Sequence, residues 1–123
     1  ISVAELFDKI TILNIKTQKI MDSKKLENVK TELKILNNQA DKIKVNNKEE
    51  LSELIKKLQS INEELWDIEN FKRECEANKD FGENFISLSR DVHFKNDIRA
   101  QIKKEINLIS NSLIVEEKEY SNY

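Results

Sequence analysis

Three consecutive stretches of this chain carry apolar residues at alternating steps of three and four positions, and each stretch starts in a new phase. The first lies within 3–20, the second within 26–43 and the third within 51–75. Residues spaced in this way share one side of an α-helix and form a narrow apolar seam. Such a seam must be buried against another helix. The pattern therefore predicts an all-α fold in which three long helices form an antiparallel bundle with coiled-coil-like seams.

The composition and the capping residues agree with this fold. The chain has no proline and one glycine, so it contains almost no residues that interrupt a helix. Ser2 and Asn47 each precede a glutamate by three residues, which is the spacing of a capping box. We expect a turn at Asp22-Ser23, with Ser23 as the cap of the second helix. The three predicted helices span 2–21, 23–44 and 48–77.

The C-terminal third of the chain predicts two shorter helices. The segment 78–82 contains the glycine and is the clearest loop. In the helix after it, Phe85, Leu88 and Val92 share one side. We expect Asn96-Asp97 to break that helix and to cap a last one, whose apolar stripe runs from Ile98 to Leu113. The predicted organisation is a single helical domain over 1–123, with a three-helix core over 1–77, a helical pair over 83–114 packed on it, and a tail over 115–123.

Charge and composition exclude several classes of function. Charged residues make up 36% of the chain but nearly cancel, to a formal net charge of -2, so the sequence predicts no nucleic-acid partner. One histidine, one cysteine and one glycine favour neither a metal site nor a phosphate-binding loop. A lone cysteine fits a reducing compartment, and no apolar run is long enough to span a membrane. We expect a cytoplasmic protein with no cofactor, no metal and no membrane partner.

The first helix carries apolar residues on two sides. Its seam holds Leu6 and Leu13, and at about 100° per residue Ile12 and Ile15 lie nearly opposite them. Such a helix must be covered from two directions, by the C-terminal helices or by a second copy of the chain. This surplus of apolar surface predicts an interaction or scaffolding module that self-associates, as a dimer in the simplest case, or that binds another protein. The predicted interface residues are Phe7, Ile12, Ile15, Trp66 and Phe71.

Polar residues among these apolar positions support an alternative function. Asp8 and Thr11 lie among apolar neighbours and need polar partners, which Arg90, Arg99 or Lys103 could supply. The simpler interpretation is a structural ion pair that holds the C-terminal helices to the bundle. The alternative is a small enzyme or binding protein whose site takes an anionic metabolite, a phosphate or a carboxylate that could be sugar-linked.

Glu69 is a second candidate for chemistry. It projects close to the apolar side of the third helix, where burial would raise its pKa and suit it to acid–base catalysis. The simpler interpretation is an exposed carboxylate paired with Lys72 or Arg73 at helical spacing.

A third candidate is a basic group near the predicted start of the last helix. Arg90, His93 and Arg99 flank that start, where the helix dipole favours an anion. A solvated basic edge is the simpler interpretation. No residue is predicted to be catalytic. The full set of predicted ligand-binding residues is Asp8, Thr11, Glu69, Arg90, His93, Arg99 and Lys103.

Four strings spread over nearly the whole chain carry a resemblance to a known family. They are ELFDKITIL at 5–13, LWDIE at 65–69, NDIRA at 96–100 and VEEK at 115–118. Together they resemble a small all-helical family of bacteria and their phages whose function is unknown. The resemblance implies a bacterial or phage protein with one all-α domain, and it assigns no catalytic residue. It draws attention to Asp8, Lys9, Thr11, Trp66, Asp97 and Arg99.

Overall fold

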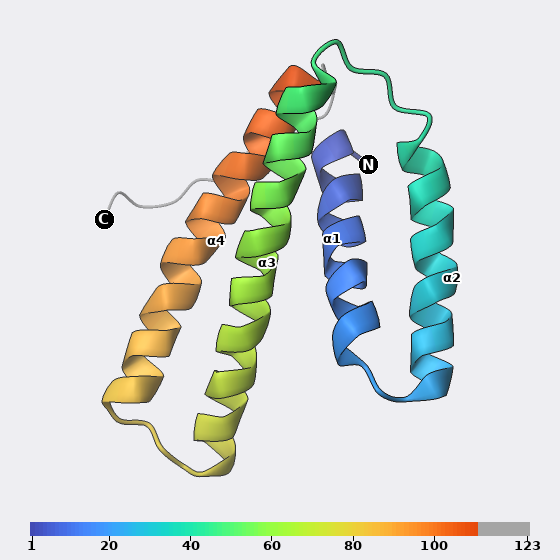
Figure 1. Cartoon of the computed structure of the whole chain (residues 1–123). Coiled ribbons are helices and arrows are strands. Elements are labelled where there is room, and N and C mark those ends of the chain that lie inside the picture. Colours follow the sequence, from blue (N-terminus) through green and yellow to red (C-terminus); the bar gives the residue numbers. More distant parts are fainter. Residues whose placement is uncertain (111–123) are drawn as a thin grey trace.

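The computed structural model describes residues 1–110 as four helices, and this part of the chain contains no strand (Figure 1). The helices are α1 (Val3–Lys19), α2 (Ser23–Ala40), α3 (Lys48–Ala77) and α4 (Glu83–Ile109). The all-α class is confirmed. The predicted division into three long helices and two shorter ones is wrong, because a single long helix follows the third one.

α4 runs through Asn96-Asp97 without a break, so Asp97 caps no helix. Neither residue is proline or glycine, and their weak helix propensity is a small cost that packing can override. That packing comes from α3 and α1, which both contact α4. The predicted pair over 83–114 is therefore one helix as far as Ile109. Leu113, the VEEK string and the predicted tail over 115–123 lie outside the described residues.

The ends of the first three helices follow local capping chemistry. Ser2 Oγ and Asn47 Oδ1 accept hydrogen bonds from the backbone N–H three residues ahead, at 3.1 and 3.0 Å, as the capping-box spacing predicts. α2 begins at Ser23, but its cap is Asp22, whose carboxylate accepts two backbone N–H bonds at 3.0 Å. α2 ends at Ala40 rather than at the predicted position 44, because the following segment crosses to the start of α3 (Figure 1).

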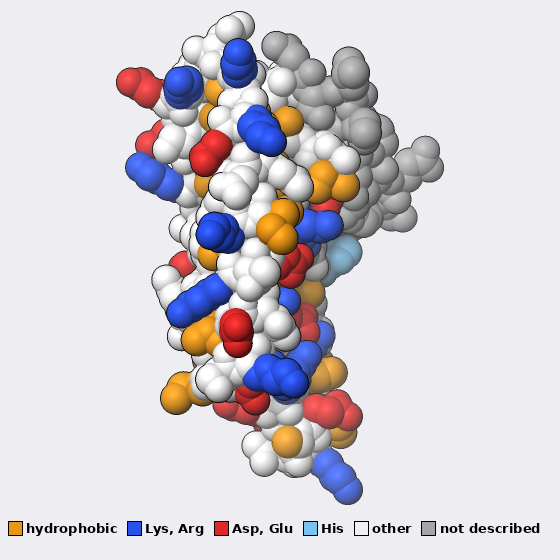
Figure 2. Space-filling model, turned by 90° about the vertical axis from the view of Figure 1, so that its right-hand side faces the viewer, with side chains coloured by type: hydrophobic (Ala, Val, Ile, Leu, Met, Phe, Trp, Pro, Cys, Tyr) orange, Lys and Arg blue, Asp and Glu red, His pale blue; other side chains and the backbone are white. Residues whose placement is uncertain are grey.

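The helices form two hairpins, α1–α2 and α3–α4, that lie side by side (Figure 1). α1 is central and contacts α2, α3 and α4, whereas α2 contacts only α1 among the described helices. The last turns of α3 extend past the end of the α1–α2 hairpin and are accompanied there by α4 (Figure 1). The outward side of α2 carries basic and acidic side chains along its whole length (Figure 2).

The core lies where α1, α3 and α4 meet. Leu58 of α3 and Ile106 of α4 are 0% exposed and belong to one cluster with Leu6 and Ile10 of α1. Ile15, from the second apolar side of α1, is also fully buried. The two apolar sides of α1 are thus both covered within one chain.

A buried hydrogen bond also joins the two ends of the described chain. The backbone N–H of Ala4 donates to Oδ1 of Asn107 at 2.9 Å, and both residues are fully buried. The first N–H groups of a helix have no partner within the helix, so Asn107 satisfies one of them for α1. This bond fixes the last turns of α4 against the first turn of α1. None of the four helices combines the length and the apolar character needed to cross a membrane.

Candidate functional site

A cluster of charged side chains lies buried between α1 and α4. Asp8 is 3% exposed, and its Oδ1 accepts a hydrogen bond from Nε of Arg99 at 3.0 Å while its Oδ2 accepts one from Nη2. Nζ of Lys103 donates to Oε1 of Glu5 and lies 3.9 Å from Oδ2 of Asp8. These four residues, which we call the Asp8 cluster, contain two positive and two negative groups. Their charges balance.

Asn62 of α3 connects this cluster to the third helix. Its Nδ2 donates to Oδ1 of Asp8 at 3.0 Å and to Oγ1 of Thr11 at 2.8 Å. The hydroxyl of Thr11 in turn donates to the backbone carbonyl of Asp8 at 2.8 Å. Because both hydrogens of the Asn62 amide have partners, the orientation of the amide is fixed.

The electrostatics of Asp8 follow from these contacts. Burial alone raises the pKa of its carboxyl. The hydrogen bonds from Arg99 and Asn62, together with the positive charges of Arg99 and Lys103, outweigh burial and hold the pKa of Asp8 below its usual value of 3.8. Asp8 is therefore ionised at neutral pH.

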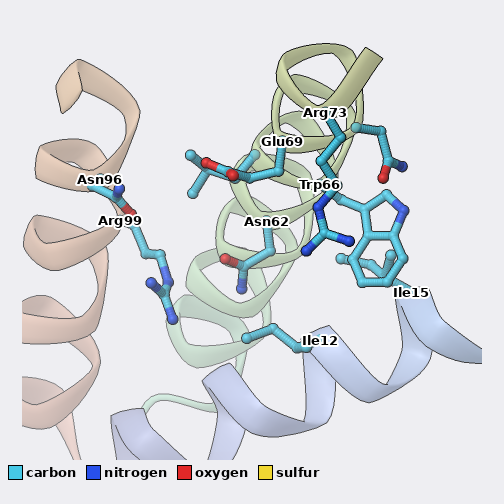
Figure 3. Close-up of a pocket in the computed structure, with 10 residues that line it drawn as sticks. Ile12, Ile15, Asn62, Trp66, Glu69, Arg73, Asn96 and Arg99 are labelled. Carbon is cyan, nitrogen blue, oxygen red and sulfur yellow. The ribbon is translucent and has the colours of Figure 1, made fainter. Parts of the chain in front are cut away.

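A pocket of about 370 Å³ lies beside the Asp8 cluster, between α1, α3 and α4 (Figure 3). We call it the three-helix pocket. Its volume falls near the lower end of the range of about 300–1,000 Å³ that is usual for small-molecule sites. Apolar walls come from α1 and α3, and polar groups come from α3 and α4. The lining residues are Ile12, Ile15, Asn62, Leu65, Trp66, Glu69, Asn70, Arg73, Asn96 and Arg99.

Glu69 and Arg73 point in different directions from the same side of α3. Their spacing of four residues would allow an ion pair, yet among residues 1–110 neither side chain forms one. Figure 3 shows the carboxylate of Glu69 directed toward α4 and the guanidinium of Arg73 beside Trp66. The amide of Asn62 lies between them (Figure 3). The three-helix pocket thus holds a separated positive and negative charge.

The comparison with known proteins extends over the whole chain. Residues 1–123 match the model of a family of unknown function, DUF6165. The chain belongs to DUF6165. No curated protein and no solved structure matches this DUF6165 chain. The resemblance to a family of unknown function is confirmed, whereas a bacterial or phage origin stays a prediction.

The fold of this DUF6165 protein brings some of the predicted ligand-binding residues together and separates others. Arg99 and Lys103 are the partners of Asp8, and Arg99 also lines the three-helix pocket with Glu69. His93 lines a second pocket, of about 430 Å³, together with Arg99 and Lys103. Arg90 lies farther along α4, where it lines an apolar groove with His93. Glu69 is exposed, so the burial expected for an acid–base catalyst is not found, and its predicted interaction with Lys72 or Arg73 is not formed within residues 1–110 either.

The predicted interface residues also divide into groups. Phe7 and Ile15 are buried within the chain. Ile12 and Trp66 are half-buried in the walls of the three-helix pocket, and Phe71 of α3 is 52% exposed. The DUF6165 chain therefore uses most of these side chains inside its own fold.

Four polar residues of the pocket were not among the predicted site residues: Asn62, Asn70, Arg73 and Asn96. A signal for Asn62 exists in the sequence, because this amide lies one turn after Leu58 and next to Ile61, both of them seam residues. In the described part of the chain, His, Cys, Asp and Glu side chains form no group of three that could hold a metal ion.

Proposed function

We propose that this protein binds a small metabolite with an anionic group, a carboxylate or a phosphate, in the three-helix pocket. The main support for this proposal is that Arg73, Arg99 and Asn62 line the same pocket as Trp66. Charged and amide groups fix the orientation of a ligand, and an aromatic wall supplies contact area.

Arg99 supports binding because its position is fixed before any ligand arrives. Asp8 accepts hydrogen bonds from Nε and Nη2, so the plane of the guanidinium is set at the wall of the pocket. A guanidinium held in this way loses little conformational entropy when a ligand contacts it.

Apolar side chains supply the other half of the site. Trp66 and Ile15 form a wall beside Arg73 and away from Glu69, and Ile12 lies along α1 from them (Figure 3). A flat ring or a branched apolar group would bury its surface there. The modest volume of the pocket favours a ligand with a single ring over a nucleotide.

Binding can be measured through the fluorescence of Trp66, which is the only tryptophan of the chain. The probes are 3-phenylpropionate, phenyl phosphate and L-phenylalanine, and at least one should give a saturable change in emission, with calorimetry as a second readout. Arg73→Gln should weaken the binding of that probe roughly tenfold, because a charge-assisted hydrogen bond is lost at a partly solvated site.

The matched control is Lys57→Gln, which removes one positive charge from an exposed position of α3 outside the pocket. This variant should bind the probe with the same affinity as the unchanged protein. The proposal is wrong if none of the three probes binds at concentrations up to about 10 mM, or if Arg73→Gln and Lys57→Gln bind alike.

Self-association is a second candidate function, supported by the outer side of α4. Ile86, Phe94, Ile98 and Leu108 lie on this side and are each about half exposed, at 55, 46, 50 and 60%. Exposed apolar groups of this size on one helix favour contact with a second apolar surface. We propose that two copies of the chain meet along this side of α4, as a dimer with two-fold symmetry.

Light scattering at micromolar concentration should therefore give the mass of a dimer. Ile98→Glu should give a monomer, because it places a charge in the apolar contact. Ile35→Glu is the control, since Ile35 is 54% exposed on α2, the helix farthest from the proposed contact. A monomer at every concentration, or equal dissociation by both variants, would exclude this interface.

A further inference from the structure

The charges around the three-helix pocket do not suit a simple anion. The Asp8 cluster balances its own charges, so Arg99 brings no net positive charge to the pocket. The remaining charged residues of the lining are Arg73 and Glu69, one of each sign. An anion near Arg73 would be attracted by Arg73 and repelled by Glu69. A ligand that carries both charges would be attracted by both.

Asn62 adds a hydrogen-bond acceptor to the negative side of the pocket. The residue is 5% exposed, and Nδ2 donates both hydrogen bonds that its side chain forms with Asp8 and Thr11. Among residues 1–110, Oδ1 accepts no hydrogen bond, and it faces the pocket near Glu69 (Figure 3). An acceptor that opens into a pocket and has no partner among the described residues favours a ligand that brings an N–H or O–H donor.

We infer that the ligand is a zwitterion of the amino-acid class, an inference that rests on the proposed binding function of the pocket. Its carboxylate lies against Arg73, and its ammonium group lies between Glu69 and Oδ1 of Asn62. Its side chain packs on Trp66 and Ile12. Glu69 and Arg73 do not form an ion pair with each other. A zwitterionic ligand would form an ion pair with each of them.

The test compares each amino acid with the same molecule lacking the amino group. The pairs are L-phenylalanine with 3-phenylpropionate and L-leucine with 4-methylpentanoate, titrated against the full chain by Trp66 fluorescence. At least one amino acid should bind roughly tenfold more tightly than its deaminated partner, because the ammonium adds charge-assisted hydrogen bonds.

Two variants assign the ammonium contact. Glu69→Gln should remove most of the tenfold difference by weakening the amino acid and leaving the deaminated acid unchanged or slightly tighter. Glu74→Gln is the control, because Glu74 is exposed on α3 outside this pocket, and it should keep the difference.

The outcomes separate the two claims. If the deaminated acids bind as tightly as the amino acids, the zwitterion inference is wrong and the proposed function stands. The inference is also wrong if Glu69→Gln and Glu74→Gln behave alike. If neither member of either pair binds and phenyl phosphate does not bind, the proposed function fails, and the inference fails with it.

Discussion

Replacing Asp8 with asparagine is expected to lower the free energy of unfolding by about 3 kcal/mol, because it removes the charge that compensates two buried cations. Asp8 accepts hydrogen bonds from Arg99 and lies 3.9 Å from Nζ of Lys103, so the substitution removes a negative charge that both cations face. Breaking a buried pair costs about 3–5 kcal/mol in general. We expect the lower end of this range, because the side chain of Arg99 is 27% exposed and can regain some hydration.

Urea denaturation followed by circular dichroism measures this loss. The control is Glu53→Gln, which breaks an exposed ion pair between Glu53 and Lys56 and should change stability by less than about 0.5 kcal/mol. Equal effects of Asp8→Asn and Glu53→Gln would show that the Asp8 cluster does not hold α4 against α1.

Measuring the stability of the unchanged protein and of Asp8→Asn at several pH values tests whether the pKa of the Asp8 carboxyl is lowered in the folded chain. Its pKa is lowered in the folded chain, so its stabilising effect is present above the unfolded value near 3.8 and is lost as the pH falls through the folded value. The stability difference between the unchanged protein and Asp8→Asn should stay constant from about pH 7 to about pH 5 and shrink only below about pH 4. A difference that already shrinks between about pH 7 and pH 5 would mean a raised pKa.

Leu58→Ala should cost about 2–5 kcal/mol, because it opens a cavity at the centre of the core. Leu58 is 0% exposed and packs in the cluster shared by α1, α3 and α4. Tight packing there leaves little room for neighbouring side chains to fill the space. The measurement is again the free energy of unfolding in urea.

Ile35→Ala provides the matched control for this cavity. It removes the same number of carbon atoms from a side chain of α2 that is 54% exposed and lies outside the proposed dimer contact, and it should change stability by less than about 0.5 kcal/mol. A loss below about 1 kcal/mol for Leu58→Ala would contradict the position of the core.

The spacing of apolar residues was enough to predict the first three helices but not the fourth. Seams, caps and short turns are local features, and α1, α2 and α3 begin where those features predict. The continuity of α4 through Asn96-Asp97 is not a local feature. Asn96 lines the three-helix pocket and Arg99 pairs with Asp8, so contacts with two other helices accompany α4 through this point. Helix propensity is a local property of the sequence, so it cannot predict contacts that depend on the tertiary arrangement.

The candidate site could be predicted in part for a related reason. Asp8 stood out because a carboxylate among apolar neighbours needs a partner, and Arg99 and Lys103 were among the partners considered. The role of Arg73 could not be predicted, because its helical spacing from Glu69 favours an ion pair that is not formed within the described residues. From the sequence one can predict on which side of a helix a side chain lies, but not the direction in which the charged group of a long side chain points.

The bond between Ala4 and Asn107 has a consequence for how the protein is made. During synthesis α1 emerges from the ribosome before α2 and α3, and the segment of α4 that covers it emerges only after them. Until then the nascent chain carries Leu6, Phe7 and Ile10 without their full cover. Contacts between such distant parts of a chain form slowly, and uncovered apolar side chains are where a growing chain is most prone to aggregate.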